Sequence, residues 1–410
     1  MSAANKIQLA LVGCGGISGS HVKAYADLFA RGCQAFEVAA CCDVSVDHAR
    51  ARAREIAAFQ GREPAVFEGV DALVRAGAAG AADVCVPHAW HHSAAVALLE
   101  GGLHVMIEKP VGITVAASRA IIAAAERSGR LLSTAENIRR CLPARACRWA
   151  LSEERLIGDV RHADVQMIYD GQLDFSKPAF KWRALRLLTG GGMIMDSGAH
   201  FTDMLLHLFG EPETVWAQVR TLDPAPVGEV PPFGASRADV EDEWLAVIGF
   251  RNGARVVWSY CRVQPGSSFR SGRYYGTRGT MECLGNKFHA FQDGGQITLR
   301  DGTVRPKEWI ETEYQKSLSA EERERLFPWG ATDGFSVEVG EFVRAVGGGG
   351  ELEMDGLAGL RAKALSMACY ESSVLGRTVA YADVLAGRLD AYQRPIDEYW
   401  KIGAPAACVS

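Results

Sequence analysis

The stretch that decides the fold is IQLALVGCGGIS, residues 7–18. An apolar run leads directly into three glycines, and a helical pattern begins a few residues later. Glycines at a junction of strand and helix permit a tight turn and let backbone amides approach a pyrophosphate at the helix N-terminus. Ser18 stands where this fingerprint has its third glycine, and it is small enough for close packing of helix on strand. We therefore expect a dinucleotide-binding turn with contacts from Gly13, Gly15, Gly16 and Ile17.

Short apolar runs alternate with helical patterns along the first third of the chain. The strands are expected at residues 7–12, 37–42, 84–86, 104–107 and 131–134, and the helices at 20–29, 46–59, 93–100 and 115–128. Strands that alternate with helices are typical of a parallel sheet covered on both faces. Residues 1–140 are therefore predicted to form a doubly wound α/β domain.

Strand patterns dominate the second part of the chain, with turn signals between them. We expect strands at residues 160–169, 214–221, 244–250, 254–261 and 279–284, and helices at 197–208 and 334–346. Turn residues between successive strand patterns favour antiparallel pairing. Residues 141–410 are thus predicted to form a second domain around a mostly antiparallel sheet, with surface excursions at 222–239 and 300–332.

The composition restricts the partners. The 410 residues include 44 basic and 49 acidic side chains, and the formal net charge is -5 without a long run of one sign. This balance argues against nucleic acid and an anionic membrane, so a small-molecule partner is favoured. The 11 cysteines contain no Cys-x-x-Cys pair, which indicates neither a disulfide framework nor a metal site. With no targeting pattern at the N-terminus, we expect a cytoplasmic protein.

Further cofactor contacts are predicted at the carboxyl ends of the strands. Asp43 ends the second strand, where a carboxylate can accept hydrogen bonds from the hydroxyls of an adenine ribose, which favours NAD. Nearby Arg50 and Arg52 leave NADP open as the alternative. Pro87, His88 and His91 follow the strand at 84–86 and are expected to face the nicotinamide half. A surface loop with helix-capping histidines is the competing interpretation of that segment.

Three polar residues form the predicted catalytic set. Lys109 follows the strand at 104–107, so it emerges at the edge of the sheet where the nicotinamide is expected, and its ammonium can favour the alkoxide form of a substrate hydroxyl. Asp196 and His200 are four residues apart on one face of a predicted helix or its N-terminal cap. A histidine there can accept the hydroxyl proton while the aspartate orients it or the substrate. A helix cap and a buried core histidine are the structural alternatives.

These motifs together resemble the glucose–fructose oxidoreductase, inositol dehydrogenase and rhizopine-catabolism family, Gfo/Idh/MocA. The segments that carry the resemblance are 13–18, 87–91, 102–110, 135–137, 182–183, 190–203 and 275–279. It implies a Rossmann domain, a C-terminal α/β domain with a large open sheet, homo-oligomers formed through that sheet as dimers or tetramers, and the catalytic trio Lys109, Asp196 and His200. Val86, His88 and Ser18 depart from the family pattern.

The resemblance also implies a reaction. Expected is the NAD-dependent oxidation of a secondary ring hydroxyl, with C3 as one candidate position, of a sugar, glycoside or inositol to a ketone. The alternatives are a glycosidase or lyase that uses transient oxidation, an NADPH-dependent keto-sugar reductase, and a nucleotide-sensing regulator, which the retained catalytic set disfavours. Glu108 is expected to contact the nicotinamide ribose or to fix its loop, and Asn137 and Arg183 are expected to reach cofactor or substrate. Trp182 is expected to contact substrate, and Asp203 either contacts substrate or supports the residues that do. Candidate stacking aromatics are Tyr169, Phe175, Phe180 and Trp182.

Overall fold

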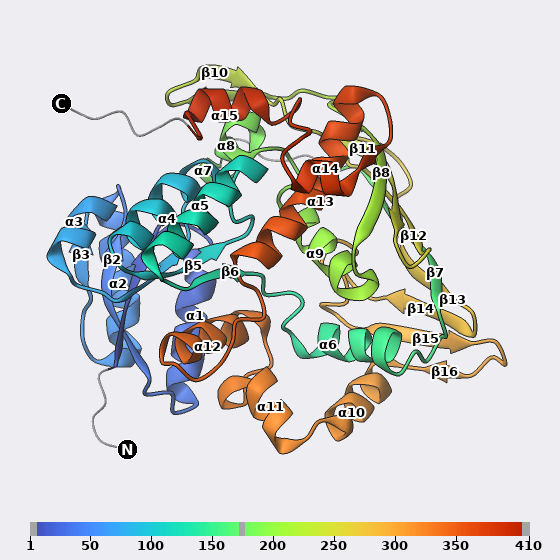
Figure 1. Ribbon diagram of the computed structural model, residues 1–410, viewed down its shortest axis with the longest axis horizontal. Helices are drawn as coiled ribbons and strands as arrows, with labels where there is room; N and C mark the ends of the chain where they lie inside the picture. Colours follow the sequence, from blue (N-terminus) through green and yellow to red (C-terminus); the bar gives the residue numbers. More distant parts are fainter. Residues whose placement is uncertain (1–5, 172–176, 404–410) are drawn as a thin grey trace. The chain divides into compact units, whose positions relative to one another are not determined.

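The computed structural model describes residues 6–171 and 177–403 (Figure 1), so that Phe175 lies outside the described residues. The chain packs into two compact units. The first contains the chain up to Gly112, Ser118–Arg140 and Leu318–Gly359, and the second contains Ile113–Ala117, Cys141–Ser317 and the chain from Leu360 onward. We keep residue 140 as the predicted domain boundary and treat Leu318–Gly359 as a segment that packs back into the first unit.

The first unit is built on a six-stranded parallel sheet. Its strands are β1 (Ile7–Val12), β2 (Phe36–Cys42), β3 (Ala65–Phe67), β4 (Ala81–Val84), β5 (His104–Glu108) and β6 (Leu132–Ala135). They follow the order β3-β2-β1-β4-β5-β6, and every neighbouring pair is parallel. The order reverses between β1 and β4, and open α/β sheets bind ligands beyond the carboxyl ends of the strands at such a point. The doubly wound fold predicted from the sequence is confirmed.

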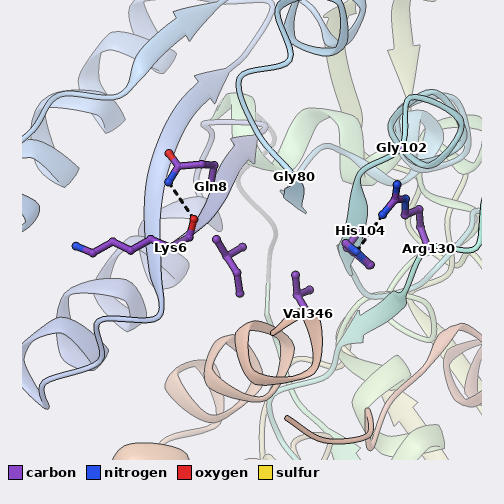
Figure 2. Close-up of a pocket in the computed structure, with 8 residues that line it drawn as sticks. Lys6, Gln8, Gly80, Gly102, His104, Arg130 and Val346 are labelled. Carbon is purple, nitrogen blue, oxygen red and sulfur yellow. Dashed lines mark hydrogen bonds between the residues drawn. The ribbon is translucent and has the colours of Figure 1, made fainter. Parts of the chain in front are cut away.

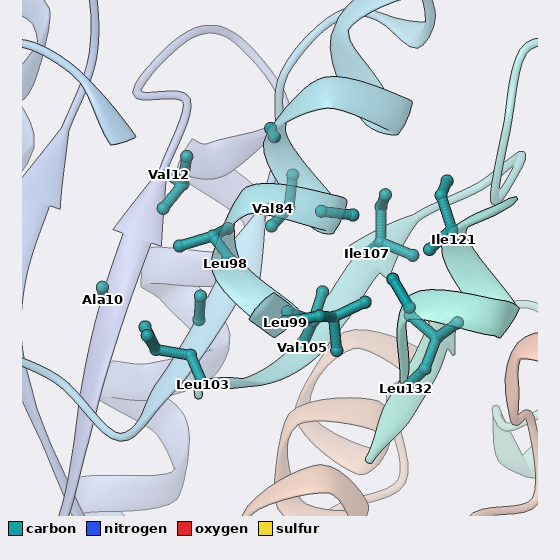
Figure 3. Packing of buried hydrophobic residues seen from close by; sticks show 14 of the residues in the cluster. Ala10, Val12, Val84, Leu98, Leu99, Leu103, Val105, Ile107, Ile121 and Leu132 are labelled. Carbon is teal, nitrogen blue, oxygen red and sulfur yellow. The ribbon is translucent and has the colours of Figure 1, made fainter. Parts of the chain in front are cut away.

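Helices cover both faces of this sheet. The helices α1 (Ser18–Ala30), α2 (Val46–Gln60) and α12 (Gly334–Val346) lie on one face, and α3 (Val70–Ala76), α4 (His91–Glu100) and α5 (Val115–Ser128) lie on the other. Figure 3 shows Leu98 and Leu99 of α4 and Ile121 of α5 packed on Val84 and Val105, all of them buried. Burying one such aliphatic side chain stabilises a fold by about 1.5–3 kcal/mol.

Arg140 ties the returning segment to the Rossmann sheet. Its fully buried guanidinium donates to Glu341 of α12 at 2.8 and 3.2 Å. It also donates to the carbonyls of Thr134 and Glu136, at the end of β6, at 3.2 and 3.1 Å. A second contact joins the same segment to β6, because the amide of Thr134 donates to the carbonyl of Met354 at 2.7 Å. The segment also contains α11 (Ala320–Leu326).

The second unit is built on a nine-stranded sheet. Its strands are β7 (Val160–Ile168), β8 (Pro212–Arg220), β11 (Glu243–Phe250), β12 (Arg255–Cys261), β13 (Phe269–Gly276), β14 (Gly279–Cys283), β15 (Gly295–Leu299), β16 (Val304–Arg305) and β17 (Val379–Ala380). The order is β16-β15-β14-β13-β7-β12-β11-β8-β17. Among the described strands of this sheet, only β7 and β12 pair in parallel. The predicted mostly antiparallel sheet is confirmed.

Two long helices pack against one another and against this sheet. On α9 (Ser197–Phe209), the ring of Phe201 lies 5.0 Å from that of Trp258. A hydrogen bond of 3.0 Å joins Thr202 of α9 to Ser366 of α13 (Gly356–Leu375). These contacts hold α9 against the sheet and against α13, and they fix the position of the start of α9. The unit's other helices are α6 (Leu142–Arg148), α7 (Pro178–Lys181), α8 (Arg186–Thr189), α10 (Lys307–Ser317), α14 (Tyr381–Leu385) and α15 (Arg394–Trp400).

The structure corrects three sequence expectations. The strand expected at 84–86 is β4, which starts earlier, at Ala81, because its first residues are alanines that give a weak strand pattern. The excursion at 222–239 contains a hairpin of β9 (Pro226–Val230) and β10 (Gly234–Arg237). The excursion at 300–332 is largely helical, in α10 and α11, whose many charged residues hid the helical period. In the part of the chain that the structure describes, no helix is long and apolar enough to cross a membrane.

Candidate cofactor and substrate sites

The glycine turn after β1 has the shape that a bound pyrophosphate needs. Gly13 has φ +87°, and a Cβ there would lie 2.7 Å from the carbonyl carbon of Cys85 and from the amide nitrogen of Val86. A Cβ at Gly15 or Gly16 would meet nothing within 4 Å. Gly13 therefore lets the turn sit against the end of β4, while Gly15 and Gly16 leave their backbone open to a ligand. These residues fit a dinucleotide.

Ser18 and Arg52 brace this turn. Ser18 is fully buried at the start of α1, and its hydroxyl donates to the carbonyl of Gly15 at 2.7 Å. Arg52 of α2 donates to the Ser18 hydroxyl at 3.0 Å and to the Gly15 carbonyl at 2.9 Å. Its remaining nitrogen pairs with Glu55 at 2.5 Å. Because Arg52 is held by these three partners, its guanidinium is already engaged in the turn, which supports the preference for NAD over NADP.

Asp43 lies at the end of β2, beside the same turn. Its Oδ2 accepts the amide of Cys14 and its Oδ1 accepts the amide of Ser45, both at 2.7 Å. Each carboxylate oxygen has a second lone pair for another donor. The carboxylate is thus fixed in place and can still receive ribose hydroxyls.

The loop after β4 is tied to the loop after β5 by His91. This imidazole is fully buried, and its two nitrogens lie 2.8 Å from the carbonyl of Pro110 and 2.9 Å from that of Val86. Burial lowers the pKa of His91. Pro87 precedes the short helical turn His88–Trp90, and the His88 ring lies 5.6 Å from the His91 ring. His91 therefore holds the two loops together through the carbonyls of Pro110 and Val86. Direct contacts of Pro87, His88 and His91 with the cofactor stay a prediction.

Lys109 lies at the carboxyl end of β5, as predicted. Its peptide bond to Pro110 is cis. Its amide donates to Glu108 Oε2 at 3.0 Å, and Glu108 Oε1 lies 3.0 Å from His21 Nε2. Glu108 therefore joins the lysine backbone to a histidine inside the domain. His21 was not among the predicted site residues, although it shares the buried face of α1 with Tyr25 and Leu28 at helical spacing.

Asn137 is placed just after β6. A Cβ at Gly334 would lie 1.9 Å from the Asn137 carbonyl oxygen, so the N-terminus of α12 packs directly against this residue. Whether Asn137 contacts the cofactor stays a prediction.

A pocket lies at the opposite edge of the parallel sheet, where the strands begin. It has a volume of about 540 Å³ and is lined by Lys6, Ile7, Gln8, Gly80, Gly102, His104, Arg130 and Val346 (Figure 2). The proposed cofactor residues lie at the ends of the strands instead, so this pocket is distinct from the cofactor site.

In the second unit, Asp196 and His200 lie at the start of α9. Asp196 is the N-cap residue, its side chain makes no capping hydrogen bond, and its Oδ2 accepts Arg183 Nε at 3.0 Å. The Arg183 guanidinium lies over the Trp182 ring at 4.6 Å. Asp196 therefore occupies the N-cap position by its backbone. Its carboxylate pairs instead with Arg183, which was predicted to contact substrate.

His200 lies one turn into α9 and is 7% exposed. Its ring lies 4.9 Å from the ring of His289, at an interplanar angle of 78°. His289 Nδ1 in turn lies 3.0 Å from Gln292 Oε1. His289 was not among the predicted site residues, because no motif links the loop after β14 to α9. Asp203 is 2% exposed on the inner side of the same helix.

Buried polar groups hold the glycine-rich segment before α9. Glu241 is 4% exposed, and its two oxygens accept the amides of Gly192 and Ile194 at 2.7 and 2.8 Å. A Cβ at Gly191 would lie 2.1 Å from the hydroxyl of Tyr370. Neither Glu241 nor Tyr370 was among the predicted site residues. They fix the backbone that leads to Asp196 and His200.

Two family models match the chain. One is described as an oxidoreductase family with an NAD-binding Rossmann fold and matches residues 7–136. The other is described as the GFO/IDH/MocA C-terminal domain and matches residues 149–282, so that together they match more than half of the chain. The chain belongs to the GFO/IDH/MocA family. The predicted family is thus confirmed, and the NAD-binding model confirms NAD as the predicted cofactor.

Named relatives within GFO/IDH/MocA act on sugars. Levoglucosan dehydrogenase of Pseudarthrobacter phenanthrenivorans is 31% identical over 183 residues, which are 42% of this chain and 46% of that protein. The 1,5-anhydro-D-fructose reductase of Ensifer adhaerens is 25% identical over 52% of this chain and 58% of its own. D-glucoside 3-dehydrogenase of Escherichia coli is 23% identical over 54% and 61%. The chain thus spans about half the length of the curated relatives it matches.

Solved GFO/IDH/MocA-like structures share the fold. Levoglucosan dehydrogenase in complex with NADH and levoglucosan matches with a TM-score of 0.72 and 20% identity, over 92% of this chain and 99% of that chain. The WlbA dehydrogenase from Bordetella pertussis in complex with NADH and UDP-GlcNAcA matches with a TM-score of 0.71 and 23% identity, over 92% and 98%. At these identities the likeness concerns the fold.

A buried lysine in the second unit of this GFO/IDH/MocA protein gives a stability prediction. Lys363 of α13 is 2% exposed, and its Nζ lies 3.4 Å from Met195 Sδ. Burial lowers the pKa of Lys363 well below its usual value, although Asp397 opposes this shift. Replacing Lys363 with methionine, which has a similar length and no charge, is expected to raise the free energy of unfolding at pH 7 by about 1–3 kcal/mol, the cost of burying a polar group without a good hydrogen-bond partner.

The pH dependence tests the same residue. Between the lowered pKa of the folded state and the ordinary pKa of about 10.4, the unfolded chain binds a proton that the folded chain does not, so the stability due to this lysine rises with pH. Urea unfolding at several pH values should show this rise in the wild type and a flatter profile in Lys363→Met. If Lys363→Met is less stable than the wild type at pH 7, Lys363 is charged in the folded protein and stabilised by an acidic partner such as Asp397.

Proposed function

We propose that this protein oxidises a secondary ring hydroxyl of a sugar, glycoside or inositol to a ketone, with NAD as the hydride acceptor. The observation that carries the proposal is the match of both parts of the chain to one oxidoreductase family. Lys109, at the carboxyl end of β5, and the Asp196–His200 pair, at the start of α9, supply the polar groups that the reaction needs. The names of the relatives support an anhydrosugar or a glycoside as the substrate class.

The proposed roles follow from the chemistry of an alcohol. A secondary hydroxyl becomes a carbonyl by losing its proton and the hydride on its carbon. His200 accepts the hydroxyl proton, since imidazole is a base near neutral pH. Lys109 donates a hydrogen bond to the same oxygen and stabilises its negative charge. Asp196, held by Arg183, orients the ring, and Trp182, Arg183 and Asp203 are proposed to contact it.

The cofactor residues are proposed to act by binding and orientation. The open backbone at Gly15 and Gly16 receives the pyrophosphate, and Asp43 receives the adenine ribose. Ile17, Pro87, His88, His91, Glu108 and Asn137 remain proposed contacts. NAD, when bound, supplies the hydride acceptor.

Purified protein incubated with NAD and a panel of levoglucosan, glucosides, hexoses and inositols tests this function. The expected result is a rise in NADH absorbance with one ring class, together with the corresponding keto-sugar in product analysis. Cleaved glycoside with no net NADH would indicate transient oxidation instead. Consumption of NADPH with keto-sugars, and no reaction in the oxidative direction, would favour the reductase that one relative's name suggests.

Asp43 gives a prediction about nucleotide preference. Replacing it with asparagine keeps the side-chain shape and one acceptor oxygen but removes the charge. Because hydrogen bonds to charged groups contribute about 1.5–3 kcal/mol, the Kd for NAD is expected to rise by roughly tenfold or more. The Kd for NADP is expected to change little or to fall. Fluorescence titration with both nucleotides measures this, and an unchanged NAD affinity would contradict the assigned ribose contact.

The proposal extends to a cytoplasmic homo-oligomer. Trp216, Val247 and Val257 are directly paired on β8, β11 and β12, and all three are half-buried on the face opposite the fully buried side chains. A second copy of the sheet would cover this apolar row. Light scattering of the purified protein gives the subunit number.

A further inference from the structure

A chain of buried hydrogen bonds runs through the first unit to the backbone of Lys109. Tyr25 of α1 donates to Asp83 Oδ2, which also lies 2.8 Å from His21 Nδ1. His21 Nε2 lies 3.0 Å from Glu108 Oε1, and Glu108 Oε2 accepts the Lys109 amide at 3.0 Å. Tyr25, His21 and Asp83 are 0% exposed and Glu108 is 7% exposed. Water therefore has little access to the chain of contacts.

Counting protons shows what this arrangement requires. A neutral imidazole has one N–H, so it can donate to only one of two carboxylates. Both nitrogens of His21 face a carboxylate, and hence all of these contacts are hydrogen bonds only if the cluster of His21, Asp83 and Glu108 holds one proton more than neutral His21 with both carboxylates ionised. An imidazole is more basic than a carboxylate by about two pKa units. The extra proton is therefore expected on His21, as an imidazolium.

The groups around His21 favour the same state. Burial alone would lower the pKa of His21, but Asp83 outweighs this effect and raises it well above its usual value. Glu338 of α12 also acts on the cluster, but burial raises the pKa of this carboxyl, which favours its neutral form. The Phe335 ring covers His21 edge-on at 5.6 Å. Arg140 lies 3.7 Å from Glu338, on the side of the cluster formed by α12.

A metal ion is the competing explanation for this cluster. His21, Asp83 and Cys85 offer ligand atoms within 4.8 Å of one another. However, both nitrogens of His21 already have carboxylate partners, Asp83 at 2.8 Å and Glu108 at 3.0 Å, so neither nitrogen is open to a metal ion.

We propose that His21 is a permanent imidazolium that bridges Asp83 and Glu108 and thereby holds Glu108 where it fixes the backbone of Lys109. His21 is in this sense a positioning residue. The part of the proposal that concerns turnover rests on the proposed role of Lys109. The protonation state of His21 does not depend on that role.

The protonation state is tested by ¹⁵N NMR of the histidine side chains in the full-length protein between pH 6 and 9. The His21 signal, assigned by its loss in His21→Gln, is expected to show two protonated nitrogens up to pH 9. The urea-unfolded protein is the reference, since its histidines lose the proton at about pH 6.5. A neutral His21 at pH 8 would overturn the proposal, as would a stoichiometric metal whose removal changes the signal.

Turnover tests the positioning role. In His21→Gln the kcat is expected to fall at least about tenfold, because small displacements of catalytic groups cost up to about 100-fold. The KM for NAD is expected to change less than kcat, because Glu108 keeps its carboxylate. If this variant fails to fold, Tyr25→Phe, which removes one donor to Asp83, is the milder test, and a smaller fall in kcat is expected. Variants that fold and keep the wild-type kcat would overturn the positioning role. If the wild type has no turnover on any sugar, the proposed function fails and the NMR result still decides the state of His21.

Discussion

Replacing His200 with asparagine is expected to lower kcat by about 10²- to 10⁴-fold, the usual contribution of a general base. Asparagine keeps a polar side chain of similar size at this 7% exposed position, so the fold should persist. It cannot accept the hydroxyl proton, however. The Kd for NAD is expected to stay unchanged, since His200 lies outside the NAD-binding unit.

His207 provides the matched control. It lies on the same helix, α9, and is half-buried near its C-terminal end. His207→Asn should keep kcat within about threefold of the wild type, because no role in the reaction is assigned to it. Equal losses in both variants would indicate damage to α9, and no loss in His200→Asn would contradict its role as the base.

Replacing Gly13 with alanine is expected to abolish NAD binding and to destabilise the fold by about 2–5 kcal/mol. Two effects add. The left-handed backbone, at φ +87°, strains any residue with a Cβ, and the new Cβ would lie 2.7 Å from the backbone of Cys85 and Val86. The turn would have to move away from the end of β4, and the backbone that receives the pyrophosphate would move with it.

Gly32 separates the two effects. It also has φ +87°, but a Cβ there would meet nothing within 4 Å. Gly32→Ala should therefore show only the backbone strain, about 1–2 kcal/mol, with normal NAD binding. Thermal unfolding and a binding titration measure both variants. Equal stabilities for the two variants would show that the contact with β4 can relax.

The elements of the first unit that depend on neighbouring residues in the sequence were predicted well. The run at 7–12 ends in glycines, so both the strand and the turn follow from short-range rules, and the bounds of α5 agree with the expected range. The bounds of α12 agree as well, but this helix was expected in the second domain and packs in the first unit. β3 and α3 were missed because both are short. α13, with 20 residues, was missed because apolar residues lie all around it, as in a buried helix.

The candidate site residues also fall into two groups, those that a local motif predicts and those that only the fold brings to the site. Lys109, Asp196 and His200 follow from motifs, since each lies within a few residues of a strand end or helix start. His21, Glu241 and His289 contact these motifs from 47 to 89 residues away in the sequence, and only the folded chain creates these contacts. A buried polar residue on an apolar helix face, such as His21 on α1, is the one signal that was available in advance.

The central claim is direct hydride transfer from a ring carbon, and isotope transfer tests it most directly. A sugar of the reactive class, deuterated at the carbon that bears the hydroxyl, is incubated with the protein and NAD, and the mass of the NADH formed is measured. The account predicts NADH that is one mass unit heavier, in step with the ketone formed. Ketone formation with unlabelled NADH, or loss of the deuterium to solvent, would contradict it.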